Sequence, residues 1–339
     1  MNLEEIFHNI VILNRGEKGW DELVPEKLPW IHTFSAKPLL AILSAANETC
    51  ATIIIENEYV DVDYLDSYTN YYATLFADYP SKCYRLHFFA SRLTYEDLRD
   101  LSPHQEHYFG FCILRPTLSF QMSRSVLRPF HEGNGFFYTL CKAQFEVNLA
   151  GSRLFVTGAP YIQQDTNVSV CAQASIWMAS LYMHKRFEAP RLFPSQINEL
   201  IRRCLSLGSV REGLNPLQVV IALREMGYEP HYFPRLQGEP PFSMAKLIYG
   251  YAESEIPVIL ALKTPHGGHA VMVVGHDFKV RDDLKDAWDS NLNWIDNFYI
   301  NDDAQGPYLK LGIENVASGP GGSGYSVKEN VVGAIKRFS

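Results

Sequence analysis

The order of apolar and polar positions along the chain predicts buried helices and strands in its second half. Residues 172–183 are apolar on nearly every side of a helix, which indicates a helix enclosed in the core. Residues 270–274 form a continuous apolar run after two glycines, which predicts a strand buried on both faces. Similar patterns predict helices over residues 215–227 and 243–253, and strands over residues 256–262 and 297–300.

The first half of the chain has a different pattern of apolar and polar residues. It predicts a helix over residues 37–46, a helix after Asp63, and strands over residues 52–56, 84–89, 108–114 and 145–149. A turn signal around Gly151 separates this half from the rest. We therefore expect an α+β protein with a β-rich accessory domain of unknown role over residues 1–150 and a second domain over residues 151–339.

Composition excludes several classes of partner. The 339-residue chain carries a net charge of −8 and has no basic run, so we expect no nucleic-acid partner. No apolar stretch reaches the length of a membrane span, and the N-terminus lacks the basic and apolar parts of a secretion signal. Six scattered cysteines suit a reducing compartment and predict a cytoplasmic location. Nothing in the composition indicates an oligomeric state.

Two residues stand where nucleophilic chemistry needs them. Cys171 begins the apolar helix, and His269 begins the buried strand. A thiol is a good nucleophile only as the thiolate, which a helix N-terminus and a nearby imidazolium both favour. A cap at Asn167 or Ser169 would place Cys171 in the first helical turn. The pattern predicts a Cys–His nucleophile pair, and the remaining cysteines are interpreted as core thiols.

Two further residues complete a candidate catalytic group. The turn that ends the strand over residues 297–300 offers a carboxylate to orient the His269 ring. Asp302 is our choice; Asn301 and Asp303 remain alternatives because one residue of register decides between them. Upstream, Gln164 and the backbone N–H of Cys171 are expected to donate hydrogen bonds to a developing oxyanion.

The region from about Tyr161 to Tyr308 resembles the papain-like fold, and within it the C39-type cysteine peptidases. In that family a glutamine precedes a helix headed by cysteine, a glycine-histidine-apolar strand follows, and an aspartate ends a later strand. Gln164, Cys171, His269 and Asp302 match these positions in that order. Gln164 lies one position further from the cysteine than is usual, and Asp302-Asp303 replaces the usual Asp-Pro. The resemblance implies a papain-like (C39-like) cysteine peptidase domain over residues 151–339.

The predicted function is hydrolysis of a peptide or isopeptide bond in a peptide or protein substrate. Cys171 would be the nucleophile, His269 the acid and base, Asp302 the orienting carboxylate and Gln164 an oxyanion donor. This chemistry needs no cofactor. Acyl transfer or deamidation through the same acyl-enzyme remains an alternative, as does a papain-like binding module without catalysis.

Two local clusters invite a metal interpretation that the sequence does not favour. A zinc site built on His266, His269 and His276 is not expected, because residues 269 and 276 should face opposite sides of a strand and no Cys-x-x-Cys pair is present. We therefore predict no metal. The acidic residues of the other cluster lack the glycine and closing glutamate of a calcium loop, so we interpret them as a solvated acidic edge. They are Glu56, Glu58, Asp61, Asp63 and Asp66.

Overall fold

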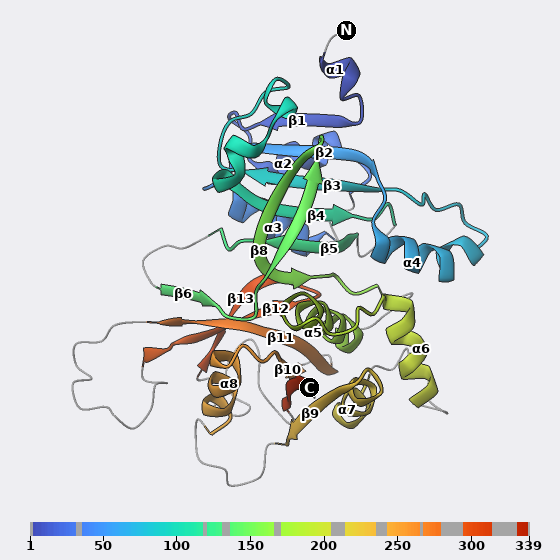
Figure 1. The fold of residues 1–339 in the computed structure, drawn as a ribbon, viewed down its shortest axis with the longest axis vertical. Helices are drawn as coiled ribbons and strands as arrows, with labels where there is room; N and C mark the ends of the chain where they lie inside the picture. The colour runs from blue at the N-terminus through green and yellow to red at the C-terminus, as the bar shows by residue number, and fades with distance from the viewer. Residues whose placement is uncertain are drawn as a thin grey trace.

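The computed structural model describes most of the chain and contains both helices and strands, as an α+β protein should. Its strands form two antiparallel sheets, one above the other in Figure 1. In the described part of the chain, no helix is both long enough and apolar enough to cross a membrane. The described residues are 3–31, 36–117, 121–130, 136–165, 171–204, 214–234, 243–264, 267–278, 294–313 and 331–337.

The first sheet is built mainly from the N-terminal half. In β7 the residues Phe145, Val147 and Leu149 are buried while those between them are exposed, so one face of the strand packs into the core. In spatial order the strands are β1 (Ile10–Asn14), β2 (Thr52–Tyr59), β3 (Cys83–Phe89), β4 (Tyr108–Leu114), β5 (Met122–Leu127), β8 (Ser152–Tyr161) and β7 (Ala143–Leu149). The helices of this half are α1 (Leu3–Ile6), α2 (Trp20–Lys27), α3 (Lys37–Ala46), α4 (Val62–Asn70), and the 3-10 helices η1 (Tyr72–Thr74), η2 (Asp97–Arg99) and η3 (Ser102–His107).

The second sheet carries the candidate site. Its strands, in spatial order, are β13 (Gly306–Gly312), β12 (Asn297–Asp302), β11 (Gly267–Phe278), β10 (Val258–Thr264), β14 (Val331–Arg337) and β9 (Tyr228–Phe233), and β6 (Phe136–Thr139) also pairs with β11. Its helices are α5 (Cys171–Phe187), α6 (Pro194–Cys204), α7 (Pro216–Glu225) and α8 (Ser243–Glu253).

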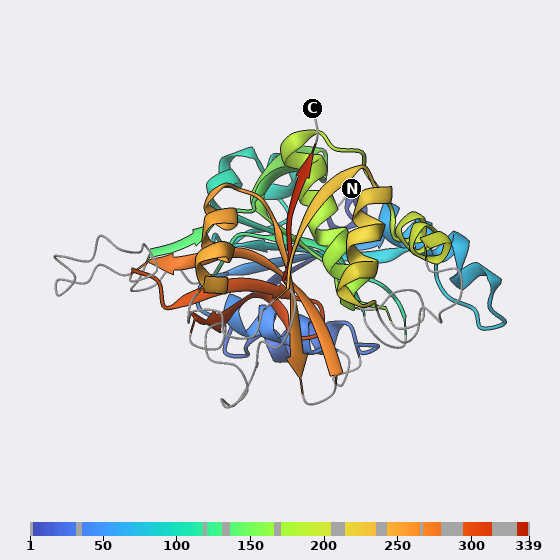
Figure 2. The same cartoon turned by 90° about the horizontal axis from the view of Figure 1, so that it is seen from below.

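Helices α5 and α8 cover different faces of this sheet, as the view from below shows (Figure 2). Met272 and Val274 of β11 belong to the same core cluster as the buried residues of α5. Val271 and Val273, which alternate with them, belong to the cluster that contains Ile248 of α8. Strand β11 is therefore buried on both faces, as its continuous apolar run predicts.

The expected division between residues 150 and 151 falls inside the first sheet. Strands β7 and β8 form a hairpin in which Leu149 pairs with Ser152, and both turn residues, Ala150 (+49°) and Gly151 (+83°), have a positive φ. Strand β8 continues the first sheet to Tyr161 by pairing with β5. A cut at this point would therefore separate two hydrogen-bonded strands of one sheet.

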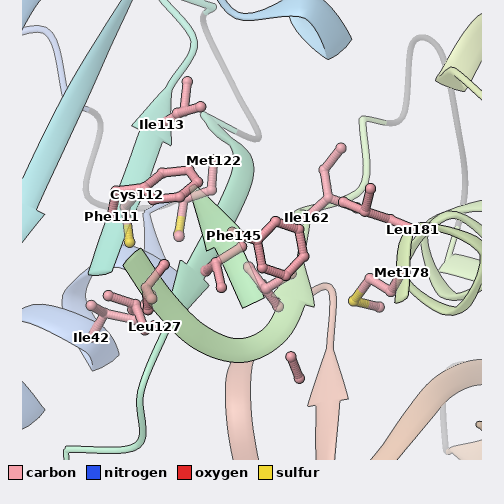
Figure 3. Close-up of a cluster of buried hydrophobic side chains, with 14 of the residues drawn as sticks. Ile42, Phe111, Cys112, Ile113, Met122, Leu127, Phe145, Ile162, Met178 and Leu181 are labelled. Carbon is pink, nitrogen blue, oxygen red and sulfur yellow. The ribbon is translucent and has the colours of Figure 1, made fainter. Parts of the chain in front are cut away.

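One hydrophobic core also runs across this point. Figure 3 shows Phe111 of β4 and Met122 of β5 in the same cluster as Met178 and Leu181 of helix α5. Strand β6, which precedes the expected division, belongs to the second sheet through its pairing with β11. The two halves are joined by shared strands and shared apolar packing rather than by a linker.

The interpretation of the acidic cluster as a solvated edge is wrong for its central members. Asp61 and Asp63 are buried, with exposed fractions of 0% and 1%. The Asp61 carboxylate caps α4 by accepting the N–H of Tyr64 (3.0 Å), and Arg191 donates to both oxygens of Asp63 (2.9 and 2.7 Å). Burial of these carboxylates is tolerated because basic side chains from distant segments pair with them.

Candidate functional site

Cys171 is the first described residue of helix α5. Residues 172–183 behind it are all buried, so the helix is fixed on every side. Cys171 itself is partly exposed, whereas Cys50, Cys83, Cys112 and Cys141 are buried. The capping positions predicted at Asn167 and Ser169 lie outside the described residues. The thiol at the start of α5 is therefore accessible on a rigid support.

His269 lies near the start of β11, opposite Leu262 of β10. Strand β11 is flanked on its other side by β12, whose last residues reach the same end of the sheet. The His269 side chain is 16% exposed. The sheet thus brings the imidazole beside the carboxylates that end β12.

The structure brings Cys171, His269 and Asp302 together. The Nε2 atom of His269 lies 3.0 Å from Oδ1 of Asp302, and the Cys171 side chain hydrogen-bonds to the imidazole. Burial alone lowers the pKa of His269, but the hydrogen bonds to Asp302 and Cys171 and the charges of Asp302 and Asp303 raise it to about 11. This environment favours the imidazolium form.

Of the two carboxylates among the three candidates for the orienting residue, Asp302 lies closer to the ring. Its Oδ1 atom also accepts the backbone N–H groups of Ala304 (2.8 Å) and Gln305 (3.1 Å) in the turn after β12. Asn301 has other partners: its amide donates to the carbonyl of Pro160 (3.0 Å), and its side-chain oxygen accepts the N–H of Tyr308 (3.1 Å). Hydrogen bonds therefore hold Asp302 facing His269, whereas the Asn301 side chain joins β12 to β8 and β13.

Asp303 is a second carboxylate at the same imidazole. Its Oδ1 atom lies 3.7 Å from Nε2 of His269, and the side chain is fully buried. Neither carboxylate oxygen has a hydrogen-bond partner among the described residues. Burial raises the pKa of Asp303 to about 7; the charge of His269 opposes the shift and that of Asp302 reinforces it. The sequence indicates Asp303 only as an alternative to Asp302, and no signal in it shows that both face the ring.

Two tyrosines connect this end of the second sheet to the first. The Tyr161 hydroxyl at the end of β8 donates to the backbone carbonyls of Asp302 (3.2 Å) and Asp303 (3.1 Å). The Tyr308 hydroxyl donates to the carbonyl of Leu127 (2.6 Å) and accepts the N–H of Ala159 (2.9 Å). The first sheet, through Tyr161 of β8, therefore holds the backbone that carries both carboxylates, a role that sequence reasoning missed.

Gln164 lies in a segment anchored on the first sheet. The side-chain oxygen of Gln163 accepts the N–H of Met122 (3.1 Å), and Asp165 accepts a hydrogen bond from Tyr72 and faces Arg115 at 3.7 Å. Gln164 itself is partly exposed between these two buried neighbours. The residues that join it to Cys171 lie outside the described part, so its role as an oxyanion donor stays a prediction.

The other histidine of β11 belongs to a separate pair. Nε2 of His276 lies 2.6 Å from Oε1 of Glu253 in α8, and Nδ1 hydrogen-bonds to the carbonyl of Asp277 (2.7 Å). His266 lies outside the described residues. Among the described residues, the group with metal-ligand geometry is instead His269, Asp302 and Asp303, whose ligand atoms all lie within 4.8 Å of one another.

No model of a known protein family matches this chain, and no curated protein matches it. Its function is therefore inferred from the chemistry of the site.

Proposed function

We propose that this protein is a cysteine peptidase or isopeptidase that acts through Cys171, His269 and Asp302. One observation carries the proposal: a continuous series of contacts runs from the thiol through the imidazole to a carboxylate. The three residues come from α5, β11 and β12, which are far apart in the chain. A nucleophile, a base and a group that orients the base are the components of covalent acyl-transfer catalysis.

Each residue has a defined part in the reaction. His269 takes the proton of the Cys171 thiol, and the thiolate attacks the carbonyl carbon of the substrate. When the C–N bond breaks, His269 gives that proton to the leaving amine, and a thioester forms on Cys171. His269 then removes a proton from water, which hydrolyses the thioester and restores the thiol. Asp302 holds the ring in one orientation throughout and stabilises its charged form.

The arrangement of elements supports a papain-like architecture for the second half. A buried helix headed by Cys171 packs against β11 of an antiparallel sheet. His269 and Asp302 lie on neighbouring strands of that sheet. The expected order of cysteine, histidine and aspartate along the chain is also that of the C39-type peptidases. On this basis the substrate class is a peptide or a protein.

The environments of four other cysteines support Cys171 as the reactive thiol. Burial raises the pKa of Cys50 and of Cys112 to about 12. Burial also raises the pKa of Cys83 and Cys141. These thiols are protonated at neutral pH and have little contact with solvent, so they are poor nucleophiles.

The proposal is tested by labelling the intact protein with a peptidic thiol-reactive probe and locating the adduct by mass spectrometry. We expect the adduct on Cys171, and we expect a Cys204→Ser variant to be labelled as the wild type is. Labelling only at another cysteine, or labelling of Cys171 no faster than that of a free thiol in a peptide, would contradict a catalytic role. Release of ammonia from a glutamine-containing peptide would instead identify the acyl-enzyme as that of a deamidase.

A further inference from the structure

The carboxylate of Asp303 is buried without a hydrogen-bond donor. Its exposed fraction is 0%, and neither oxygen has a hydrogen-bond partner among the described residues. A buried carboxylate that lacks hydrogen bonds is unfavourable, and groups of this kind in folded proteins usually have a function or bind an ion. Its Oδ1 atom faces the same imidazole nitrogen as Asp302 does. Two carboxylates therefore face one imidazole nitrogen, although one carboxylate is enough to orient the ring.

The distances at this point fit a small divalent cation. A tetrahedral Zn²⁺ ion with nitrogen and oxygen ligands at about 2.0–2.2 Å requires its ligand atoms to lie about 3.4 Å apart. The Nε2 atom of His269 lies 3.0 Å from Oδ1 of Asp302 and 3.7 Å from Oδ1 of Asp303. All three ligand atoms fall within 4.8 Å of one another. Small side-chain rotations would equalise these separations around one ion.

The chemistry of the three ligands also suits zinc. Imidazole nitrogen and carboxylate oxygen are both common zinc ligands, and two carboxylates neutralise the charge of Zn²⁺. The ion would give Asp303 a closer partner than the imidazole nitrogen at 3.7 Å. This ligand set has one histidine and two carboxylates. It differs from the set of three histidines that the sequence argues against.

We propose that His269, Asp302 and Asp303 form a Zn²⁺ site and that binding of the ion switches the peptidase off. The binding part of this proposal is independent of the proposed function, and the inhibition part rests on it. Zn²⁺ takes the lone pair of Nε2, and the proton that this nitrogen held leaves to solvent. The other ring nitrogen then carries the single proton of a neutral imidazole. His269 can no longer alternate between imidazole and imidazolium, which hydrolysis requires.

The same strand offers a matched control. His276 and Glu253 also form an imidazole–carboxylate pair, at 2.6 Å. Unlike Asp303, Glu253 is exposed, with 42% of its side chain accessible to solvent. If any histidine–carboxylate pair of this protein bound zinc, removal of His276 would change the affinity as much as removal of His269.

The test is Zn²⁺ binding to the full chain, measured by competition with a chromophoric chelator. We expect one tight Zn²⁺ in the wild type and in Cys171→Ser and His276→Gln. Asp303→Asn should bind at least about 100-fold more weakly, because loss even of an outer partner of a metal site costs about 10–100-fold. His269→Gln should show the same loss, and it keeps the test valid if Asp303→Asn does not fold.

Three results would overturn the site: no tight binding to the wild type, unchanged affinity in folded Asp303→Asn or His269→Gln, or loss of affinity in Cys171→Ser or His276→Gln. Inhibition is measured separately, as the rate of labelling of Cys171 by the peptidic probe with and without Zn²⁺. Zinc binding without any probe labelling of Cys171 would support the metal site and contradict the peptidase proposal. Probe labelling unchanged at saturating Zn²⁺ would refute the switch.

Discussion

Two pairs of buried carboxylates lie in different regions of this molecule, and they differ in their partners. Asp61 and Asp63, at the start of α4, receive hydrogen bonds from Arg124 and Arg191, at 3.0 Å and 2.7 Å respectively. Asp302 and Asp303, at the end of β12, share one imidazole, and Asp303 has no hydrogen-bond donor among the described residues. The first pair is saturated with cationic partners, and the second is not.

Burial and pKa alone do not distinguish the two regions. Burial and the charge of Asp61 raise the pKa of Asp63 to about 6, against the opposing charges of Arg191 and Arg124. Burial raises the pKa of Asp303 in the same direction. What differs is the partner: a guanidinium cannot release its proton in a protein, whereas an imidazole can pass its proton to another group. We infer that the first pair stabilises the fold and that the second serves chemistry.

The largest expected effect is the loss of activity in Cys171→Ala. Activity should fall at least about 10⁴-fold, because the nucleophile is removed from a group that works as a unit. The substitution removes little volume from a partly exposed position, so the free energy of unfolding should change by at most about 2 kcal/mol. Both quantities are measured on the same preparation, by peptide hydrolysis and by urea unfolding. Activity near that of the wild type would assign the chemistry to another residue.

In the α4 region, Arg191→Ala should lower the stability of the protein but not its activity. Loss of one partner from a buried ion pair costs about 3 kcal/mol of stability. Activity per folded molecule should stay close to that of the wild type. The matched control is Arg186→Ala, which breaks the exposed ion pair with Glu255 and should cost about 1 kcal/mol or less. If both variants unfold at the same urea concentration, the Asp61–Asp63 pair does not stabilise the fold as we describe.

A smaller effect on activity is expected from loss of the orienting carboxylate. Asp302→Ala should keep about 100-fold more activity than Cys171→Ala, because the nucleophile and base remain while the ring is free to rotate. Asn301→Ala should affect stability more than activity, since its side chain bonds to Pro160 and Tyr308. The three variants Asn301→Ala, Asp302→Ala and Asp303→Ala are compared in one assay. A larger loss in Asp303→Ala than in Asp302→Ala would exchange the roles of the two carboxylates.

The last expected effect, which is on stability alone and appears only as pH changes, is a pH dependence that Asp303 introduces. Its pKa is raised from 3.8 to about 7, so the folded protein binds a proton there that the unfolded chain releases. The resulting stabilisation is fully present below pH 3.8 and is lost as pH rises through about 7. Asp303→Asn should therefore become more stable relative to the wild type, by up to about 4 kcal/mol, as pH rises from 4 to 8. A constant difference across this range would show that Asp303 has no such shift.

Local signals in the sequence were sufficient for several elements. The helix predicted over residues 37–46 is α3 with the same bounds, and the helix over residues 243–253 is α8. Helix α7 is fixed by a capping box between Asn215 and Gln218, and the positive φ of Gly227 (+85°) ends it. These predictions are confirmed because the residues that determine each element lie within it or next to it.

Partners from distant segments could not be predicted in the same way. The acidic cluster looked solvated because Arg191 lies far along the chain from Asp63. The choice between Asp302 and Asp303 depended on register, and the pairing of β12 with β13 is irregular between Ile300 and Asp302. The anchoring of this turn by Tyr161 depends on contact between the two sheets. No local pattern reports such contacts.

The most direct test of the central claim is the rate at which iodoacetamide alkylates Cys171 in the wild type and in His269→Ala, followed across pH by mass spectrometry. At about pH 6 an ordinary thiol is almost entirely protonated and reacts slowly. If His269 stabilises the thiolate, alkylation of the wild type should stay fast at this pH, and His269→Ala should react at least about 10-fold more slowly. Equal rates for the two proteins on the acid side of the profile would contradict a thiol–imidazole pair and the peptidase function with it.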